Sequence, residues 1–437
     1  MMSAEPLRLT VPLGENLLGV VTSFSEQAGL ALGLGRTEAM KLTLAAEEVF
    51  SYLLRRSRPE ESIRLEAASG GYYVELKLLF PSGRVDLSVF NLTADLSLDD
   101  EAGLEKLGLL IASRSVERFS ILTDQEGGLG LSFRKEKKYP PPGEEPPPEV
   151  GPLGELKVVP PGPEQLKLLA RLLAAHYQPN YYPSDFALPG KLVDMVGGGE
   201  FGALLATDEK ERPGGCLLWR WLEGRTVLCF GPYLFNQPQG SPAAEALVEA
   251  ALGRLAKTDA VSLICRYPTP ELPVGHFELL GELEYVAEDG QRLKWPHFFR
   301  QLKEDPGTVV WAHPELEEFL RRTYDQLFLA REVRLTRPEG EERPAQSVLG
   351  VHLDRGQNLA MVVPLWDGRD AGENLGRHVE LLLREGFRNL YVNLDLGRAW
   401  QSYLVPDLLA QGFQPRLVMP YGGTSDQVIF QHGAEAA

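Results

Sequence analysis

The chain has 437 residues, of which 43% are hydrophobic and 24% charged, and its formal net charge is −17. This length is typical of two to four domains, each able to bury an ordinary core. The negative charge argues against nucleic acid or an anionic membrane as the main partner. The start of the chain does not resemble a signal peptide, and no apolar run approaches the ~20 residues of a membrane span, so we expect a cytoplasmic protein.

The three cysteines, Cys216, Cys229 and Cys265, lie in apolar runs typical of strands. Their spacing is not that of metal ligands. The pattern therefore predicts buried, reduced thiols and no metal site, as is usual in a cytoplasmic protein.

A proline-rich and acidic segment, YPPPGEEPPPEVGPLG at residues 139–154, divides the chain. Such a segment cannot form a helix or an inner strand, so it predicts an extended linker. We therefore expect a first domain over 1–138, a second over 155–290 and a third over 291–437. The expected fold class is α+β and α/β, with a helix-covered sandwich followed by two mixed sheets.

The first domain is expected to be an α+β sandwich, with two long helices over a mixed or antiparallel sheet. Apolar periodicity predicts helices at 15–32, 37–56 and 104–112. Alternating apolar residues and glycine turns predict strands at 7–11, 62–68, 72–80, 85–91, 116–123 and 129–135.

The segment LTLAAEEVFSYLLRRS at 42–57 resembles the first ATP box of histidine-kinase-like ATPases of the anti-sigma-factor or serine-kinase type. The resemblance extends over most of residues 7–138. It places Glu48 at the family's glutamate, and a magnesium-binding asparagine belongs four residues later on the same helical face. Tyr52 stands at that position, and a phenol is a poor magnesium ligand.

The family's second ATP box reads Asp-x-Gly-x-Gly, whereas this chain has Asn91-Leu92-Thr93-Ala94-Asp95 without a glycine. A trace of the later glycine-rich lid remains at Leu107-Gly108-Leu109. The resemblance therefore implies a degenerate domain that binds neither ATP nor magnesium and has lost phosphotransfer, with Glu48 a solvated helix residue. Such a domain would retain a regulatory role in which it binds a protein partner.

Residues 226–257 are expected to organise the second domain as a strand, a short loop and a helix. Ser241 is suited to cap the helix and Pro242 to be its first residue. Apolar residues then recur at helical spacing and predict one buried face: Val248, Ala251, Leu252 and Leu255. A loop at a helix N-terminus offers free N–H groups and the positive end of the helix dipole, which suit a pyrophosphate.

The expected element order over 156–286 resembles that of GNAT-type N-acetyltransferases. That family's pyrophosphate loop reads Gln/Arg-x-x-Gly-x-Gly/Ala, and this chain has Gln237-Pro238-Gln239-Gly240-Ser241-Pro242. The glutamine and the central glycine match, whereas a proline replaces the last small residue and removes one N–H. The resemblance implies binding of acetyl-CoA or another acyl-CoA by Gln237, Gln239, Gly240 and Ser241. An ordinary helix-capping loop is the alternative.

The sequence does not define the catalytic residues of the second domain. Phe277 stands where GNAT enzymes often have a tyrosine acid. Two candidates are His276, a residue type suited to proton transfer near neutral pH, and Glu223 in a hairpin turn; the alternatives are a structural histidine and a solvated turn. The loop YQPNYYPSDFAL either lines the substrate site or packs under a lid. Its candidate residues are Tyr177, Tyr181, Tyr182 and Asp185.

The third domain resembles a second, simplified copy of the GNAT-like half. A predicted helix at 373–385, strand at 389–395, helix at 402–410 and final strand pair from Gly412 parallel residues 243–285. The loop before its first helix, 366–372, has no match to the pyrophosphate pattern. We therefore expect a packing partner without a coenzyme.

Three functions remain open from the sequence. The first is an acyl-CoA-dependent N-acyltransferase with a regulatory pseudo-ATPase domain. The second is a non-catalytic regulatory adaptor of the anti-sigma-factor type, and the third is a sensor that binds a CoA ligand without transfer. The surviving loop favours the first and third, whereas Phe277 favours the second and third.

Overall fold

The computed structural model describes residues 5–56, 61–81, 86–94, 101–123, 129–143, 146–222, 225–287, 289–337, 340 and 342–433. Contacts divide the chain into two compact units. The first consists of Met1–Tyr139, Arg343–His352 and Pro364–His378. The second consists of Pro140–Glu342, Leu353–Val363 and Val379–Ala437. Parts of the expected third domain therefore belong to each unit.

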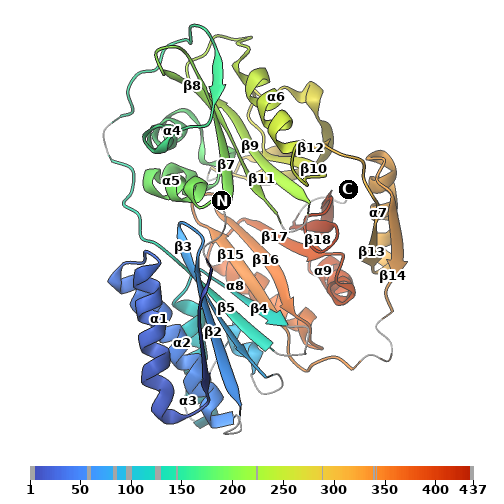
Figure 1. The fold of residues 1–437 in the computed structure, drawn as a ribbon. Coiled ribbons are helices and arrows are strands. Elements are labelled where there is room, and N and C mark those ends of the chain that lie inside the picture. Colours follow the sequence, from blue (N-terminus) through green and yellow to red (C-terminus); the bar gives the residue numbers. More distant parts are fainter. Residues whose placement is uncertain are drawn as a thin grey trace. The chain divides into compact units, whose positions relative to one another are not determined.

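The first unit contains an antiparallel sheet in the order β1-β2-β3-β5-β4 (Figure 1). Its strands are β1 (Leu7–Pro12), β2 (Ser62–Ser69), β3 (Tyr73–Phe80), β4 (Arg118–Thr123) and β5 (Leu129–Glu136). Helices α1 (Leu18–Ala31), α2 (Arg36–Arg56) and α3 (Glu101–Arg114) lie along one face of the sheet. β3 alternates half-buried and buried residues because successive side chains of a strand point to opposite faces.

Helix α2 packs on this sheet through the apolar face that its sequence predicts. Leu42, Ala46, Val49 and Leu53 are all buried and belong to one core with residues of β2, β3 and β5. The core also contains Val348 from the later part of the chain. A helix-covered antiparallel sheet, as predicted, therefore forms this unit, together with a segment that the sequence assigned elsewhere.

The expected strand at 85–91 is wrong over its described residues. A 3-10 helix, η2 (Leu87–Phe90), stands there, and Asp86 caps it by accepting hydrogen bonds from the N–H and hydroxyl of Ser88 at 3.1 and 2.6 Å. Leu87, Val89 and Phe90 are buried. The apolar run thus reflects burial, and the aspartate favours a helical cap over an extended strand.

The second unit contains a sheet of seven strands in the order β11-β12-β10-β9-β8-β7-β6. Its strands are β6 (Lys157–Val159), β7 (Phe201–Thr207), β8 (Pro213–Trp221), β9 (Thr226–Leu234), β10 (Ser262–Tyr267), β11 (Glu278–Val286) and β12 (Arg292–Gln301). Strands β9 and β10 are parallel, and α6 (Ala243–Leu255) connects them. Helices α4 (Pro163–His176) and α5 (Pro189–Gly197) precede β7. The predicted strand, loop and helix at 226–257 are therefore confirmed.

Helix α6 covers one face of this sheet with Leu247, Val248, Ala251 and Leu255, which share a core with Leu204, Leu217 and Leu263. The three cysteines are buried and free, as predicted. No helix among the described residues is long and apolar enough to cross a membrane.

Two features after β10 differ from the expectation. The sequence predicts a turn at 267–273 and then a short helix that ends at Leu280. That helix is wrong, because a 3-10 helix, η5 (Val274–His276), leads directly into β11. Prolines in the sequence YPTPELP remove the N–H groups that a helix needs. Strand β12 also pairs with β10 and β11, so the sheet continues beyond residue 290.

The rest of the chain contains a five-stranded sheet in the order β15-β16-β17-β19-β18. Its strands are β15 (Val348–Asp354), β16 (Leu359–Trp366), β17 (Asn389–Asp395), β18 (Phe413–Met419) and β19 (Gln427–His432). β16 and β17 are parallel, and α8 (Ala371–Arg384) connects them. This order matches β8-β9-β10-β12-β11 strand for strand, which supports the predicted repeat.

Between the two sheets the sequence missed strand β13 (Thr308–Ala312), which pairs in parallel with β14 (Arg331–Leu335). Helix α7 (Pro314–Gln326) connects these two strands, and the sequence predicts this helix at 316–326. The 3-10 helix η6 (Ala399–Leu404) and α9 (Val405–Ala410) precede β18. Within the second unit, Gln431 of β19 hydrogen-bonds the backbone of Glu284 in β11 at 2.6 and 2.9 Å.

Candidate functional site

The parallel pairing of β9 and β10 ends early. It runs from Thr226 and Ser262 to Phe230 and Tyr267, with a register shift before the last pair. β9 then continues to Leu234 with β8 as its strand partner. Beyond Phe230, backbone groups of β9 that face the β10 side must therefore find other partners.

The Tyr177 hydroxyl is such a partner for the backbone of β9 at Leu234. It accepts a hydrogen bond from the N–H of Leu234 at 2.7 Å and donates to the Leu234 carbonyl at 3.1 Å. Its ring packs edge-on against Tyr233 with the ring centroids 5.2 Å apart. Burial raises the pKa of Tyr177 well above its usual value, and the neighbouring carboxylate of Glu271 raises it further.

Glu271 is a site residue that sequence reasoning missed. It lies in the turn after β10, is half-buried, and comes close enough to affect the pKa of Tyr177. Its Oε2 is buried and has no hydrogen-bond partner among the residues that the structure describes. The one available signal was a carboxylate among the prolines of TPELP, at the carboxyl end of a strand.

Gln237, predicted to bind pyrophosphate, holds the end of the linker. Its Oε1 accepts a hydrogen bond from the N–H of Leu153 at 3.1 Å, and its Nε2 donates to the Phe235 carbonyl at 2.8 Å. The neighbouring Asn236 donates from Nδ2 to the Val150 carbonyl at 3.0 Å. The Gln237 side chain is therefore engaged within the protein.

The remainder of the loop leaves its backbone accessible. Gln239 and Gly240 are exposed, and Gly240 has a left-handed φ of +78°. A Cβ added to Gly240 would have no atom within 4 Å. Pro242 is the N-cap residue of α6, so the expected cap at Ser241 and first helical position at Pro242 are each wrong by one residue. The Ser241 Oγ still accepts a hydrogen bond from the N–H of Ala243 at 3.3 Å. The next two N–H groups, of Ala244 and Glu245, have no acceptor within the helix. These backbone groups are suited to an anion.

The tyrosine-rich loop is fixed by a buried glutamine. Gln357 Nε2 donates to the carbonyls of Pro179 and Tyr182 at 2.9 and 2.7 Å, and Gln357 Oε1 accepts from the Tyr267 hydroxyl at 3.2 Å. The Tyr182 side chain is buried, and burial raises its pKa. These contacts give Tyr182 a packing role.

The other two residues of this loop also make contacts within the protein. Asp185 forms an ion pair with Lys191 at 2.8 Å, and Lys191 is buried. The Tyr181 carbonyl accepts a hydrogen bond from the Tyr233 hydroxyl at 2.9 Å. Among the described contacts of the four predicted loop residues, Tyr177 is the one whose side chain hydrogen-bonds the backbone of β9 beyond Phe230.

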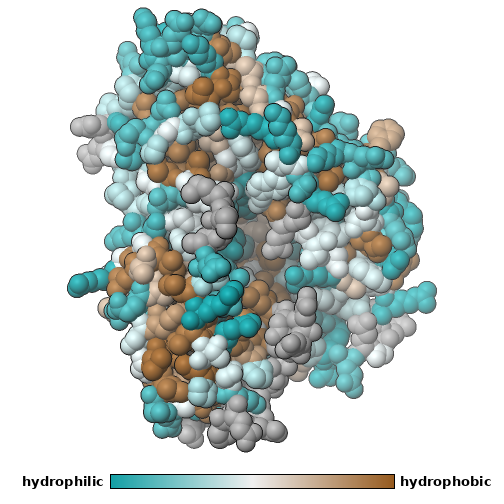
Figure 2. All heavy atoms as spheres, viewed as in Figure 1, coloured by the Kyte–Doolittle hydropathy of each residue, from teal (hydrophilic) through white to brown (hydrophobic). Residues whose placement is uncertain are grey.

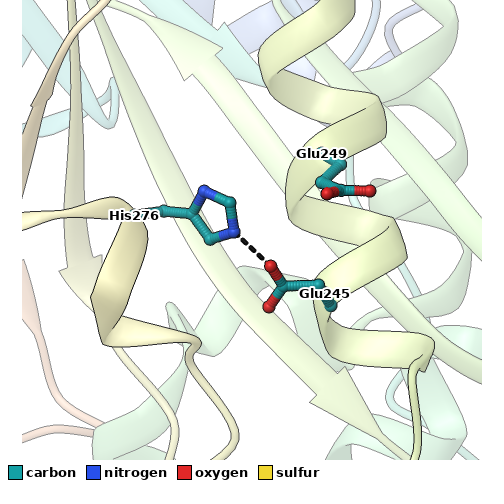
Figure 3. A group of neighbouring side chains, drawn as sticks. All are labelled: Glu245, Glu249 and His276. Carbon is teal, nitrogen blue, oxygen red and sulfur yellow. Dashed lines mark hydrogen bonds and ion pairs between the residues drawn. The ribbon is translucent and has the colours of Figure 1, made fainter.

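His276 lies beside α6, where its Nε2 hydrogen-bonds the carboxylate of Glu245 in the first helical turn (Figure 3). Glu249 lies one turn further along the same helix. The second catalytic candidate, Glu223, lies outside the described residues.

In the first unit, Tyr52 is a buried structural residue. Its hydroxyl accepts a hydrogen bond from the N–H of Asp86 at 3.1 Å, and the guanidinium of Arg56 lies 4.9 Å from its ring centroid. Glu48, expected to be solvated, is half-buried. Desolvation and the charge of Glu47 raise the pKa of Glu48, and a Cβ on Gly108 of α3 would lie 2.0 Å from its Oε2. Glu48 thus packs against α3.

Asn91, at the position of the second ATP box, joins the N-terminal domain to the later segments of the first unit. Its Oδ1 accepts from the N–H of Leu349 and from Nδ2 of Asn374, both at 2.9 Å. Its Nδ2 donates to the carbonyls of Ser347 and Ser88 at 2.8 and 3.0 Å. The buried Asn91 amide therefore has protein partners for both its donor and its acceptor.

His378 extends this buried polar cluster. Its Nδ1 lies 2.8 Å from the Asn374 carbonyl, and its Nε2 lies 3.2 Å from the N–H of Leu92. The proton therefore belongs on Nδ1, and Nε2 accepts. Burial lowers the pKa of His378 to about 4 from 6.5.

Acid is expected to destabilise the first unit through His378. Its folded pKa is below the unfolded value, so its contribution to stability is complete above about pH 6.5 and is lost as the pH falls towards 4. Acidification from pH 7 to 4.5 should cost about 2–3 kcal/mol through this group. Urea unfolding at both pH values should show a smaller acid loss for His378→Gln than for the wild type. Equal losses would contradict the assignment.

Comparisons with known proteins find no matching family model and no matching curated protein. Among solved structures, a GNAT phosphinothricin acetyltransferase from Sinorhizobium meliloti in complex with AcCoA is 17% identical, with a TM-score of 0.30 over 34% of this chain and 89% of that chain. Aminoglycoside 6'-acetyltransferase type Ii is 14% identical, with a TM-score of 0.26 over 34% of this chain and 99% of that chain.

A third solved structure, of the RsbU and RsbW domains of a Mycobacterium tuberculosis protein, is 15% identical, with a TM-score of 0.23 over 31% of this chain. The match spans 33% of that protein's chain. With identities and TM-scores this low, these likenesses carry no argument about function.

Proposed function

We propose that the second unit binds acetyl-CoA or another acyl-CoA and transfers the acyl group to an amine. The end of the parallel β9–β10 pairing supports this proposal most directly. There, β9 leads through the exposed, left-handed Gly240 to the N-terminus of α6. The N–H groups at that terminus suit the pyrophosphate, and the part of β9 without β10 as a partner suits the pantetheine arm.

Acyl transfer requires two proton movements, and we assign one side chain to each. As the amine nitrogen bonds to the thioester carbonyl carbon, the C–S bond breaks, the nitrogen loses a proton and the CoA sulfur gains one. The Glu271 carboxylate, with a buried free oxygen, would accept the proton from the amine. The Tyr177 hydroxyl would leave the Leu234 carbonyl, give its proton to the departing sulfur, and regain a proton from the neighbouring Glu271.

A sensor that binds acyl-CoA without transfer is the second candidate, and the contact between Gln237 and the linker favours it. A coenzyme that engaged Gln237 would compete with the N–H of Leu153. Binding would then release residues 150–153 from the loop and pass a signal along the linker.

We further propose that the first unit is regulatory and binds neither ATP nor magnesium. Tyr52 and Asn91 are engaged within the protein at the two positions where the ATPase resemblance places nucleotide-site residues. Figure 2 shows apolar side chains at the surface over the α1 region, and Leu7, Val20 and Met40 are exposed. Such a surface suits a protein partner.

Substitution of Gly240 tests the proposed loop. Gly240→Val is expected to weaken acetyl-CoA binding at least tenfold, about 1.4 kcal/mol, because valine disfavours the left-handed φ that shapes the proposed loop. Gly240→Asn is the matched control, since asparagine tolerates this φ, and it should lose less. Gln237→Ala should also lose less, because the proposed contacts are from the backbone.

Titration calorimetry measures the three affinities, and thermal unfolding checks that each variant folds. An unchanged affinity for Gly240→Val would contradict the assignment of the loop.

A further inference from the structure

Three side chains with metal-binding atoms converge beside α6 (Figure 3). Glu245 and Glu249 are one helical turn apart, and His276 comes from η5. One ligand atom from each residue can be chosen so that all three lie within 4.8 Å of one another. In a tetrahedral zinc site the ligand atoms are about 3–4 Å apart, so small side-chain rotations would close the set around an ion.

The charges of these residues favour a cation between them. His276 Nε2 and a carboxylate oxygen of Glu245 are already in hydrogen-bond contact. Glu249 is exposed and forms no ion pair with any residue that the structure describes. Two glutamates at this helical spacing repel each other by about 0.2–0.5 kcal/mol, and a bound cation would reverse that repulsion.

The position of His276 is fixed by its backbone. Its carbonyl accepts a hydrogen bond from Arg300 Nη1 at 3.0 Å, and its N–H donates to the Pro273 carbonyl at 3.2 Å. The imidazole therefore faces α6 from an anchored turn. Both glutamates are exposed, so water could complete the coordination.

We propose that Glu245, Glu249 and His276 bind a divalent transition-metal ion. Two carboxylates and one imidazole suit Zn²⁺, with a water molecule as the fourth ligand. This site goes beyond the proposed acyltransferase function and does not depend on it.

Metal-free, untagged full-length protein titrated with ZnCl₂ at pH 7.5 tests the proposal. Calorimetry should show one tight site per chain in the wild type. His276→Ala and Glu249→Gln should each weaken binding at least tenfold, about 1.4 kcal/mol. The matched controls are Glu278→Gln and His176→Ala, which change exposed residues outside the group and should bind as the wild type does.

A second readout uses Co²⁺, whose visible absorption on binding should be lost in the same two variants. Thermal unfolding of the metal-free variants establishes that they fold, as expected for substitutions of partly or fully exposed residues. The proposal is overturned if the wild type binds no Zn²⁺ below about 100 μM. It is equally overturned if His276→Ala and Glu249→Gln retain the wild-type affinity.

Discussion

Glu271→Gln is expected to lower kcat for acyl transfer from acetyl-CoA by about 100-fold or more, with little change in KM for acetyl-CoA. The substitution keeps the size of the side chain but removes the proposed proton acceptor at the end of the β9–β10 pairing. Release of the CoA thiol in the presence of a panel of amines measures the effect. Glu278→Gln, an exposed glutamate of β11, is the matched control and should behave as the wild type.

Tyr177→Phe complements this test. It removes the hydroxyl that satisfies the N–H and carbonyl of Leu234, so both activity and stability should fall. Glu271→Gln should cost less stability, because the Glu271 Oε2 has no hydrogen-bond partner among the described residues. Wild-type kcat in Glu271→Gln would remove Glu271 from the proposed mechanism, whatever the result for Tyr177→Phe.

The largest loss of stability is expected for Arg331→Met, at about 3–5 kcal/mol. The Arg331 side chain is fully buried, with Nη1 2.7 Å from Asp305 Oδ2 and Nε 2.7 Å from Asp426 Oδ2. Burial raises the pKa of Asp426, and the Arg331 charge opposes that shift. Removing the guanidinium would leave the Asp426 carboxylate buried without its cation.

Arg334→Met is the matched control, because Arg334 lies on the same strand and forms an exposed ion pair with Glu332 at 2.8 Å. Exposed pairs of this kind contribute about 0–1 kcal/mol. Urea unfolding should separate the two variants clearly. Similar midpoints for Arg331→Met and Arg334→Met would show that the buried pair does not stabilise the unit.

The sequence predicted the helices and strands that form because of residues close together in the chain. The apolar face of α2 and the sequence from β9 through Gly240 to α6 follow from periodicity, capping and glycine. The repeat also follows from local patterns, because the β16–α8–β17 connection has the same order of strand, helix and strand as the β9–α6–β10 connection.

What the sequence did not predict depends on contacts between distant residues. Asn91 hydrogen-bonds Ser347, 256 positions away, and this pairing brings part of the expected third domain into the first unit. Glu271 was missed because an isolated turn carboxylate forms no pattern until Tyr177 lies beside it. The role of Gln237 also depends on a distant partner, Leu153 of the linker.

Calorimetric titration of the full chain with acetyl-CoA tests acyl-CoA binding by the second unit most directly. We expect one site per chain with a Kd between about 1 μM and 1 mM, and no heat from ATP with magnesium. Absence of acetyl-CoA binding in this range would contradict both the acyltransferase and the sensor. The regulatory adaptor would then be the function that remains.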